Sequence, residues 1–143
     1  MTAFILNRTV RFGECDPAGV LYYPVYFNWT HESMESWFEE ALGFPYANIL
    51  EAYGFPSKSA TFQYISPCRV GEAIRIEFSL KTLRTRSFEI DIRLFGEDNA
   101  LRAHGHVVCV CIAVDQGAFE FKPSAIPAHL HDLMAQYRID EGG

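Results

Sequence analysis

An aspartate stands in a run of turn-forming residues near the start of the chain. Residues 13–19 read GECDPAG, so Asp16 lies between two glycines and directly before Pro17. A carboxylate in such a loop can attack an electrophilic carbonyl carbon directly, or it can take a proton from an attacking water molecule. Because Asp-Pro is also a common turn sequence, the loop alone leaves catalysis and turn formation both open.

The next residues offer hydrogen-bond donors for the oxyanion that such a reaction would form. A helical pattern begins near Tyr23 and Pro24, and the start of a helix combines unpaired backbone amides with a favourable dipole. Pro24 has no N–H and fits a first helical position, which makes the Tyr23 amide the candidate donor. Gly19 would let the backbone approach a ligand closely, whereas Tyr22 and Tyr26 are interpreted as core residues.

The helix that must position these groups is predicted over residues 24–42. Its apolar side chains recur three, four or seven positions apart, and Gly43, with Pro45 close behind, ends the pattern. Aromatic residues widen the apolar face further, so we expect a helix that is covered on most of its sides.

The remaining chain alternates with a period of two, which predicts antiparallel strands. The run over residues 101–114 becomes apolar on both parities, as expected of a central strand buried on both faces. Turn-forming residues at 115–118 predict a hairpin. The expected strands cover residues 4–12, 60–64, 74–80, 88–94, 101–114 and 119–121, and further helices cover 46–54 and 127–137.

Length and composition limit the class of protein. With 143 residues, of which 49% are hydrophobic, the chain can bury the core of one α+β domain spanning residues 1–143. A net charge of −6 argues against nucleic-acid binding. The N-terminal apolar run is too short for a signal peptide and no stretch approaches the length of a membrane span, so a cytoplasmic protein without a membrane partner is expected.

Cysteines and histidines give no metal signature. The four cysteines, at positions 15, 68, 109 and 111, include no CxxC pair and are interpreted as free thiols. His104 and His106 lie two apart and therefore share a strand face, but no third ligand stands near them in the sequence. We predict no metal site.

Residues 10–29, VRFGECDPAGVLYYPVYFNW, resemble the signature of the 4-hydroxybenzoyl-CoA thioesterase family of hotdog proteins. LRTRSF at 83–88 is a weaker match to the family's basic turn between two strands. The resemblance implies a hotdog fold, in which an antiparallel β-sheet wraps around a long central α-helix. It also implies homotetramers of two dimers, and an acyl-CoA thioesterase that needs no cofactor because coenzyme A is part of the substrate. The signature match runs through Gly13, Asp16, Pro17, Ala18, Gly19, Tyr23, Pro24 and Tyr26.

The resemblance also gives the candidate residues their roles. Asp16 is the nucleophile or general base against a thioester, and Tyr23 supplies the oxyanion donor. The basic turn contacts the nucleotide and, in hotdog dimers, lies opposite the aspartate of the neighbouring subunit. The acyl group is expected to be aromatic or short. The nucleotide contacts are Arg84, Thr85, Arg86 and Ser87. The residues themselves, rather than the resemblance, suggest Gly19, His31, Phe62 and Tyr64 as acyl contacts; Phe62 and Tyr64 could equally be core residues, and for His31 a core hydrogen bond is the favoured interpretation.

Two other functions stay open. Hotdog hydratases and dehydratases of the hydratase type pair an aspartate with a histidine five residues later, where this chain has Leu21. A non-catalytic acyl-CoA-binding protein would share the fold, and a fold alone does not prove a reaction. The presence of both Asp16 and the Tyr23-Pro24 pair favours the thioesterase over either alternative.

Overall fold

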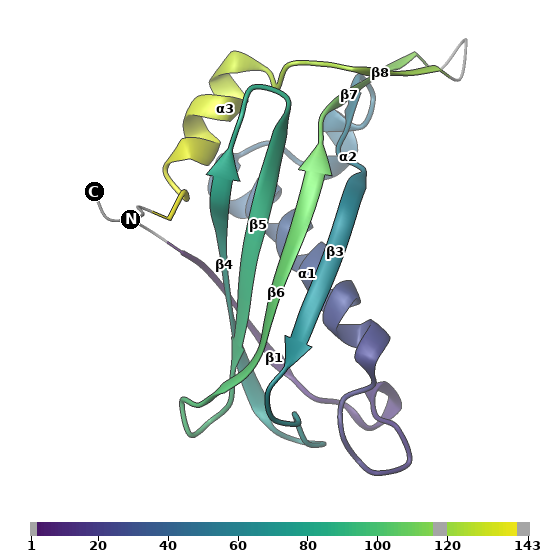
Figure 1. Ribbon diagram of the computed structural model, residues 1–143, viewed down its shortest axis with the longest axis vertical. Helices are drawn as coiled ribbons and strands as arrows, with labels where there is room; N and C mark the ends of the chain where they lie inside the picture. Colours follow the sequence, from purple (N-terminus) through teal and green to yellow (C-terminus); the bar gives the residue numbers. More distant parts are fainter. Residues whose placement is uncertain (1–2, 116–119, 140–143) are drawn as a thin grey trace.

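Five antiparallel strands form a curved sheet, and a long helix lies along one of its faces (Figure 1). The computed structural model describes residues 3–115 and 120–139. The strand order β1-β4-β5-β6-β3 places β5 at the centre and β1 and β3 at the edges. The strands are β1 (Phe4–Thr9), β3 (Ser57–Tyr64), β4 (Ala73–Leu83), β5 (Ser87–Phe95) and β6 (Leu101–Val110).

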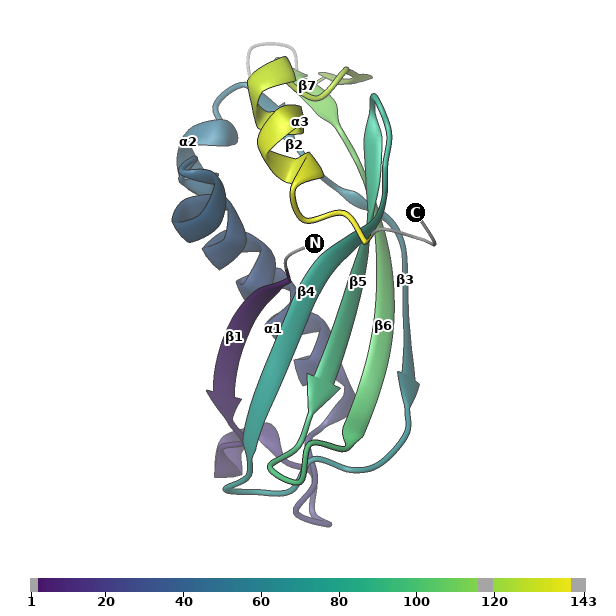
Figure 2. The same cartoon turned by 90° about the vertical axis from the view of Figure 1, so that its left-hand side faces the viewer.

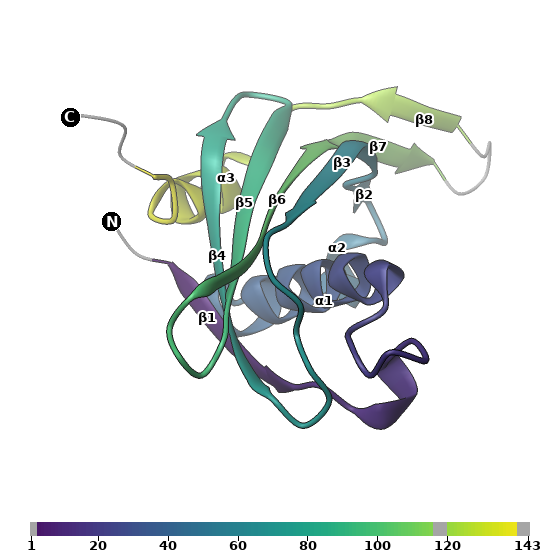
Figure 3. The same cartoon turned by 60° about the horizontal axis from the view of Figure 1, so that its bottom comes forward.

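The long helix follows the Asp16 loop, as the apolar spacing predicts. It comprises α1 (Tyr23–Ser36) and the π-helical segment η2 (Trp37–Leu42), and it ends at Gly43, whose positive φ of 74° suits a glycine. Figure 3 shows the helix beneath the concave face of the sheet. Only one side of it is buried, because polar residues such as His31 and Glu35 align along the other side. The expectation of cover on most sides is therefore wrong for the single chain.

The core lies between this helix and the inner face of the sheet. Phe78 on β4 pairs with Ile92 on β5, and Ile90 pairs with Val107 on β6, so the alternating apolar residues form one continuous layer. Trp37 is 0% exposed against this layer, and truncating such a side chain typically costs about 3–5 kcal/mol. Helix α3 (Ala128–Ala135) covers the remaining end of the core (Figure 2).

Several elements differ from the sequence predictions. The first strand ends at Thr9, and the turn η1 (Phe12–Glu14) leaves Phe12 87% exposed. The expected second helix is a single turn, α2 (Tyr46–Ile49), followed by the short strand β2 (Tyr53–Gly54). A second, small sheet has the order β2-β7-β8. Its other strands are β7 (Ile112–Asp115) and β8 (Glu120–Pro123).

The run over residues 101–114 is two strands rather than one. β6 ends at Val110, and Cys111 separates it from β7. The Cys111 N–H donates to Arg86 O, before β5, and its carbonyl oxygen accepts the N–H of Ser124, after β8. The residues on the inner face of β6 are buried, whereas those on its outer face are half-buried. The expectation that this strand is buried on both faces is therefore wrong for the single chain. The predicted hairpin at 115–118 lies largely outside the described residues. Among the described residues, no helix is both long and apolar enough to cross a bilayer.

Candidate active site

The Asp16 loop is a tight turn that fixes its own carboxylate. The Asp16 N–H donates to Val20 O at 2.9 Å, and the Gly19 N–H donates to Asp16 O at 2.9 Å. One carboxylate oxygen, Oδ1, accepts the N–H of Ala18 at 2.9 Å and of Val20 at 3.5 Å. Gly19 has a φ of 77°, which few other residues adopt without strain. Within the described chain, no hydrogen bond engages the second oxygen, Oδ2.

The loop is anchored to the segment that connects β3 to β4. Leu21 N–H donates to Cys68 O at 2.8 Å, Val70 N–H donates to Gly19 O at 3.0 Å, and Val20 forms a bridge with Arg69. The position of the Asp16 turn therefore depends on the segment between β3 and β4 as well as on the turn's own sequence.

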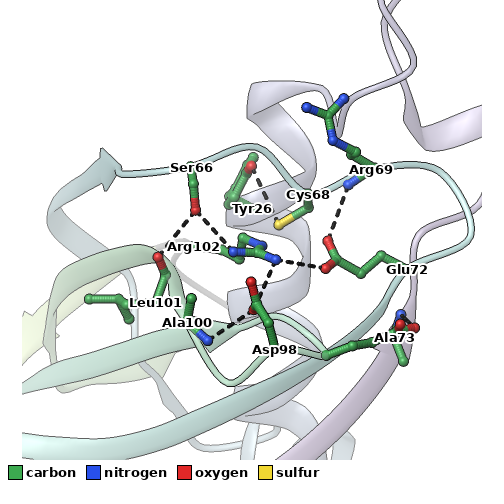
Figure 4. Close-up of polar contacts among 11 residues, drawn as sticks. Tyr26, Ser66, Cys68, Arg69, Glu72, Ala73, Asp98, Ala100, Leu101 and Arg102 are labelled. Carbon is green, nitrogen blue, oxygen red and sulfur yellow. Dashed lines mark hydrogen bonds and ion pairs between the residues drawn. The ribbon is translucent and has the colours of Figure 1, made fainter.

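Arg102, on β6, holds that connecting segment in place (Figure 4). Its guanidinium donates to Glu72 Oε2 at 2.9 Å and to Ser66 Oγ at 3.2 Å, and it lies 3.0 Å from Asp98 Oδ1. The hydrogen bond from Arg102 lowers the pKa of Glu72 below its usual value. Gly96 leaves room for the guanidinium, because a Cβ there would lie 2.4 Å from Arg102 Nη2. We call Arg102, Glu72, Asp98 and Ser66 the Arg102 network.

The start of α1 lies beside the Asp16 loop and has a backbone donor that is unused within the described chain. The Tyr23 N–H has no backbone acceptor among the described residues, as the first turn of a helix allows. The helix begins at Tyr23, so Pro24 is its second residue and not its first, as the sequence analysis expected. Glu14 ties the helix to the loop, because its Oε2 accepts the indole N–H of Trp29 at 3.1 Å.

A cavity of about 420 Å³ brings Asp16 together with Tyr23 and Tyr64. Its wall includes Tyr26, whose ring meets Tyr64 edge-on at 4.8 Å and whose hydroxyl donates to Cys68 Sγ at 3.8 Å. Burial raises the pKa of Tyr26, which keeps this phenol neutral. The cavity therefore has one carboxylate among aromatic rings, with a helix N-terminus at its side.

The other predicted acyl contacts fall outside this cavity. Gly19 does not line it, and its positive φ shapes the turn that carries Asp16. His31 lines a second cavity, of about 750 Å³, with its Nε2 3.4 Å from Glu35 Oε1. With a side chain 57% exposed, His31 does not satisfy a core hydrogen bond, which was the structural alternative. Phe62 lies between the two cavities. Its ring centroid is 5.0 Å from that of Phe27, which lines the large cavity, and 5.7 Å from that of Tyr26, which lines the small one.

The basic turn lies at the opposite end of the sheet from Asp16 (Figure 1). Arg84 N–H donates to Ser87 O at 2.8 Å, which closes the turn between β4 and β5. Arg84, Thr85 and Arg86 are exposed. A single chain therefore does not bring the predicted nucleotide contacts to its own aspartate.

Sequence reasoning did not find the Arg102 network. Glu72 and Arg102 stand 30 positions apart, in a strand connection and a strand, where isolated charged residues are ordinary. No local motif joins them, and only the pairing of β4, β5 and β6 brings them together. The spacing of charges in one sequence carries no signal for such a contact.

Residues 10–134 match the family described as the thioesterase-like superfamily. A 1,4-dihydroxy-2-naphthoyl-CoA hydrolase from Gloeothece citriformis is 30% identical, over 74% of this chain and 78% of its own. A solved gentisyl-coenzyme A thioesterase is 27% identical with a TM-score of 0.78, over 89% of this chain and 98% of its own. A 1,4-dihydroxy-2-naphthoyl-CoA thioesterase from Synechocystis, 22% identical over 94% and 96% of the two chains, has a TM-score of 0.83. These superpositions confirm the expected hotdog fold.

Proposed function

The chain belongs to the thioesterase-like superfamily, and from this premise we propose that it is an acyl-CoA thioesterase. The observation that carries the proposal is one cavity lined by both Asp16 and Tyr23, whose backbone N–H has no backbone acceptor among the described residues. Hydrolysis of a thioester needs a nucleophile or base and a donor for the oxyanion, since the thiolate is already a good leaving group. Both requirements are present at this position.

We assign different tasks to the two oxygens of Asp16. Oδ1 accepts two backbone N–H groups and so holds the carboxylate in place. Oδ2 has no hydrogen bond within the described residues, and we assign it to the reaction, either attacking the carbonyl carbon or taking the proton from water. The Tyr23 N–H, at the positive end of the helix dipole, stabilises the negative charge that develops on the carbonyl oxygen.

We assign an aromatic acyl group to the substrate. The cavity beside Asp16 is lined by Tyr22, Tyr23, Tyr26 and Tyr64, whose ring faces and edges suit a flat aromatic group. The relatives named above act on 1,4-dihydroxy-2-naphthoyl-CoA and gentisyl-CoA. Each of those acyl groups is aromatic and hydroxylated, which agrees with a pocket that combines rings and phenol groups.

The complete site needs a second copy of the chain. Strand β3 is an edge strand, and pairing it with the β3 of a second copy about a two-fold axis would set opposite ends of the two sheets side by side. The turn Arg84–Ser87 of one chain would then lie near Asp16 of the other, where its arginines bind the phosphates of coenzyme A. Two such dimers form the proposed homotetramer, which acts in the cytoplasm on a small-molecule substrate without a cofactor.

The test measures thiol release from benzoyl-, hydroxybenzoyl-, dihydroxynaphthoyl- and straight-chain CoA thioesters. We expect turnover of the aromatic thioesters, reduced by about 10²–10⁴-fold in Asp16→Asn, which keeps the shape of the side chain and removes its charge. Asp132→Asn, an exposed position on α3, is the matched control and should retain full activity.

Binding measurements separate the remaining functions. If Asp16→Asn binds the thioester as tightly as the wild type, the defect lies in chemistry rather than in recognition. Equal hydrolysis by the variant and the wild type would overturn the role of Asp16. Binding without hydrolysis by the wild type would instead identify a non-catalytic acyl-CoA-binding protein.

A further inference from the structure

Two histidines and a buried aspartate meet on the outer face of the sheet, away from the long helix. Asp91 on β5 pairs in register with His106 on β6. His104 lies two positions before His106, on the same face of β6. His104 Nε2 lies 2.7 Å from Asp91 Oδ1, and His106 Nδ1 lies 3.8 Å from the same oxygen. The sequence places no third ligand near the two histidines, but the neighbouring strand supplies one.

His106 has an unsatisfied nitrogen in this cluster. Its Nδ1 is buried and has no hydrogen-bond partner in the described chain. It faces Asp91 Oδ1 and, also at 3.8 Å, Glu89 Oε1. Hydrogen bonds to these oxygens would need a distance of about 3.2 Å or less. A buried nitrogen without a hydrogen bond costs free energy, and a cation or a water molecule between it and the two carboxylates would remove that cost.

The alternative explanation, a charge-compensated buried aspartate, accounts for only part of the cluster. Asp91 is 3% exposed, and its charge is met by His104 on Oδ1 and by Arg93, whose Nε donates to Oδ2 at 3.1 Å. These two contacts satisfy Asp91 completely without His106. They leave unexplained why His106 Nδ1 turns toward the same oxygen without a bond of its own.

The distances fit a small divalent cation. The candidate ligand atoms of Asp91, His104 and His106 all lie within 4.8 Å of one another. Tetrahedral zinc, with bonds of about 2.0–2.1 Å, separates its ligand atoms by about 3.3 Å, which lies within the range that these atoms span. Glu89 or water can take the fourth position. The Arg93 contact would then orient the ligating carboxylate from behind.

We propose that Asp91, His104 and His106 form a binding site for a divalent transition metal ion, with Zn²⁺ as the representative ion. One carboxylate and two imidazoles are ligands that zinc prefers. Because the ligands come from both β5 and β6, the ion would join these two adjacent inner strands of the sheet. Binding through Nε2 would replace the His104–Asp91 hydrogen bond and leave the ring proton of His104 on Nδ1. The site lies on the opposite face from the Asp16 cavity and is independent of hydrolysis.

Calorimetric titration of the metal-free full chain with Zn²⁺ tests this proposal. We expect one Zn²⁺ per chain and a higher Tm with Zn²⁺ present. His104→Gln and His106→Gln should each weaken binding by about 100-fold or more. His31→Gln is the matched control, because His31 also faces a carboxylate, Glu35, but has no third ligand in the described structure.

Absorption of bound Co²⁺ gives a second measurement that needs no variant. Ligation by nitrogen and oxygen gives visible bands without the ultraviolet charge-transfer band of a thiolate, and this result is expected. A thiolate band would place the metal on a cysteine and overturn the site. The proposal also fails if the wild type binds no stoichiometric Zn²⁺, or if folded His104→Gln and His106→Gln proteins bind it as tightly as the wild type.

Discussion

Arginines at the two ends of the sheet are held in contrasting ways. At the Asp16 end, the Arg102 side chain is only 12% exposed and is shared between Glu72 and Asp98. At the other end, Arg84 and Arg86 are exposed and form no ion pair with any described residue.

The contrast distinguishes an arginine whose ion pairs stabilise the fold from arginines whose guanidinium groups remain available to bind a ligand. A guanidinium already satisfied by carboxylates has few donors left for a phosphate, whereas an exposed one can form bidentate contacts at little cost. The chain thus uses Arg102 to hold the loops beside Asp16, and it leaves Arg84 and Arg86 open to solvent. Three predictions test this division, from the largest expected effect to the smallest.

The largest effect is expected from Arg102→Met. The substitution keeps the length of the side chain but leaves Glu72 unpaired, and we expect unfolding to become easier by about 2 kcal/mol, less than for a fully buried pair. Thermal denaturation should show a Tm lower by about 4–8 °C. The double variant Glu72→Gln with Arg102→Met should recover part of the loss, and Arg84→Ala should not change the Tm. An unchanged Tm in Arg102→Met would contradict a structural role.

An intermediate effect is expected from Arg84→Ala and Arg86→Ala. Each should raise KM for a CoA thioester by about 10-fold with little change in kcat, because the lost contact binds ground state and transition state alike. Steady-state kinetics on a CoA thioester and on its pantetheine analogue, which lacks the nucleotide, should show the change for the CoA substrate only. Arg138→Ala removes an exposed charge elsewhere and serves as the control. If KM stays constant in both variants, the nucleotide binds elsewhere.

The smallest effect is expected in the pH dependence of stability. Arg102 lowers the folded-state pKa of Glu72 below 4.5, so the contribution of the pair is fully present above that value. It is lost as the pH falls through the folded-state pKa. Urea unfolding from about pH 7 to about pH 3 should therefore show wild type and Glu72→Gln converging at the acidic end. A constant difference between the two proteins would mean that Glu72 is not the titrating partner.

The sequence predicted the elements that rest on local pattern. Gly43 ended the helix where expected, and the alternating strands on β4 and β5 were correctly placed, because periodicity reports directly which side faces the core. The sequence predictions were wrong where tertiary contacts determine the ends of an element. The break at Cys111 depends on hydrogen bonds to Arg86, in the turn between β4 and β5, and to Ser124, just after β8, and both residues lie far from it along the chain.

The site follows the same division. The turn around Asp16 and the free amide at Tyr23 belong to one continuous motif, so the sequence identified them together. His31 was harder to place, because a helix position alone does not tell a buried residue from one facing a cavity at the surface. The Asp91 partner of His104 and His106 comes from the neighbouring strand, and strand register is not readable from residue spacing.

Strand β3 also has a consequence for the handling of the protein. Natural edge strands discourage unwanted pairing with charges, prolines or bulges, and between Ser57 and Tyr64 this strand has one charged residue, Lys58, and one register irregularity. A strand edge with so few of these features is prone to aggregation when it is exposed. In the proposed dimer a second copy covers this edge, so variants that weaken the proposed pairing should precipitate on storage, which turbidity measurements would detect.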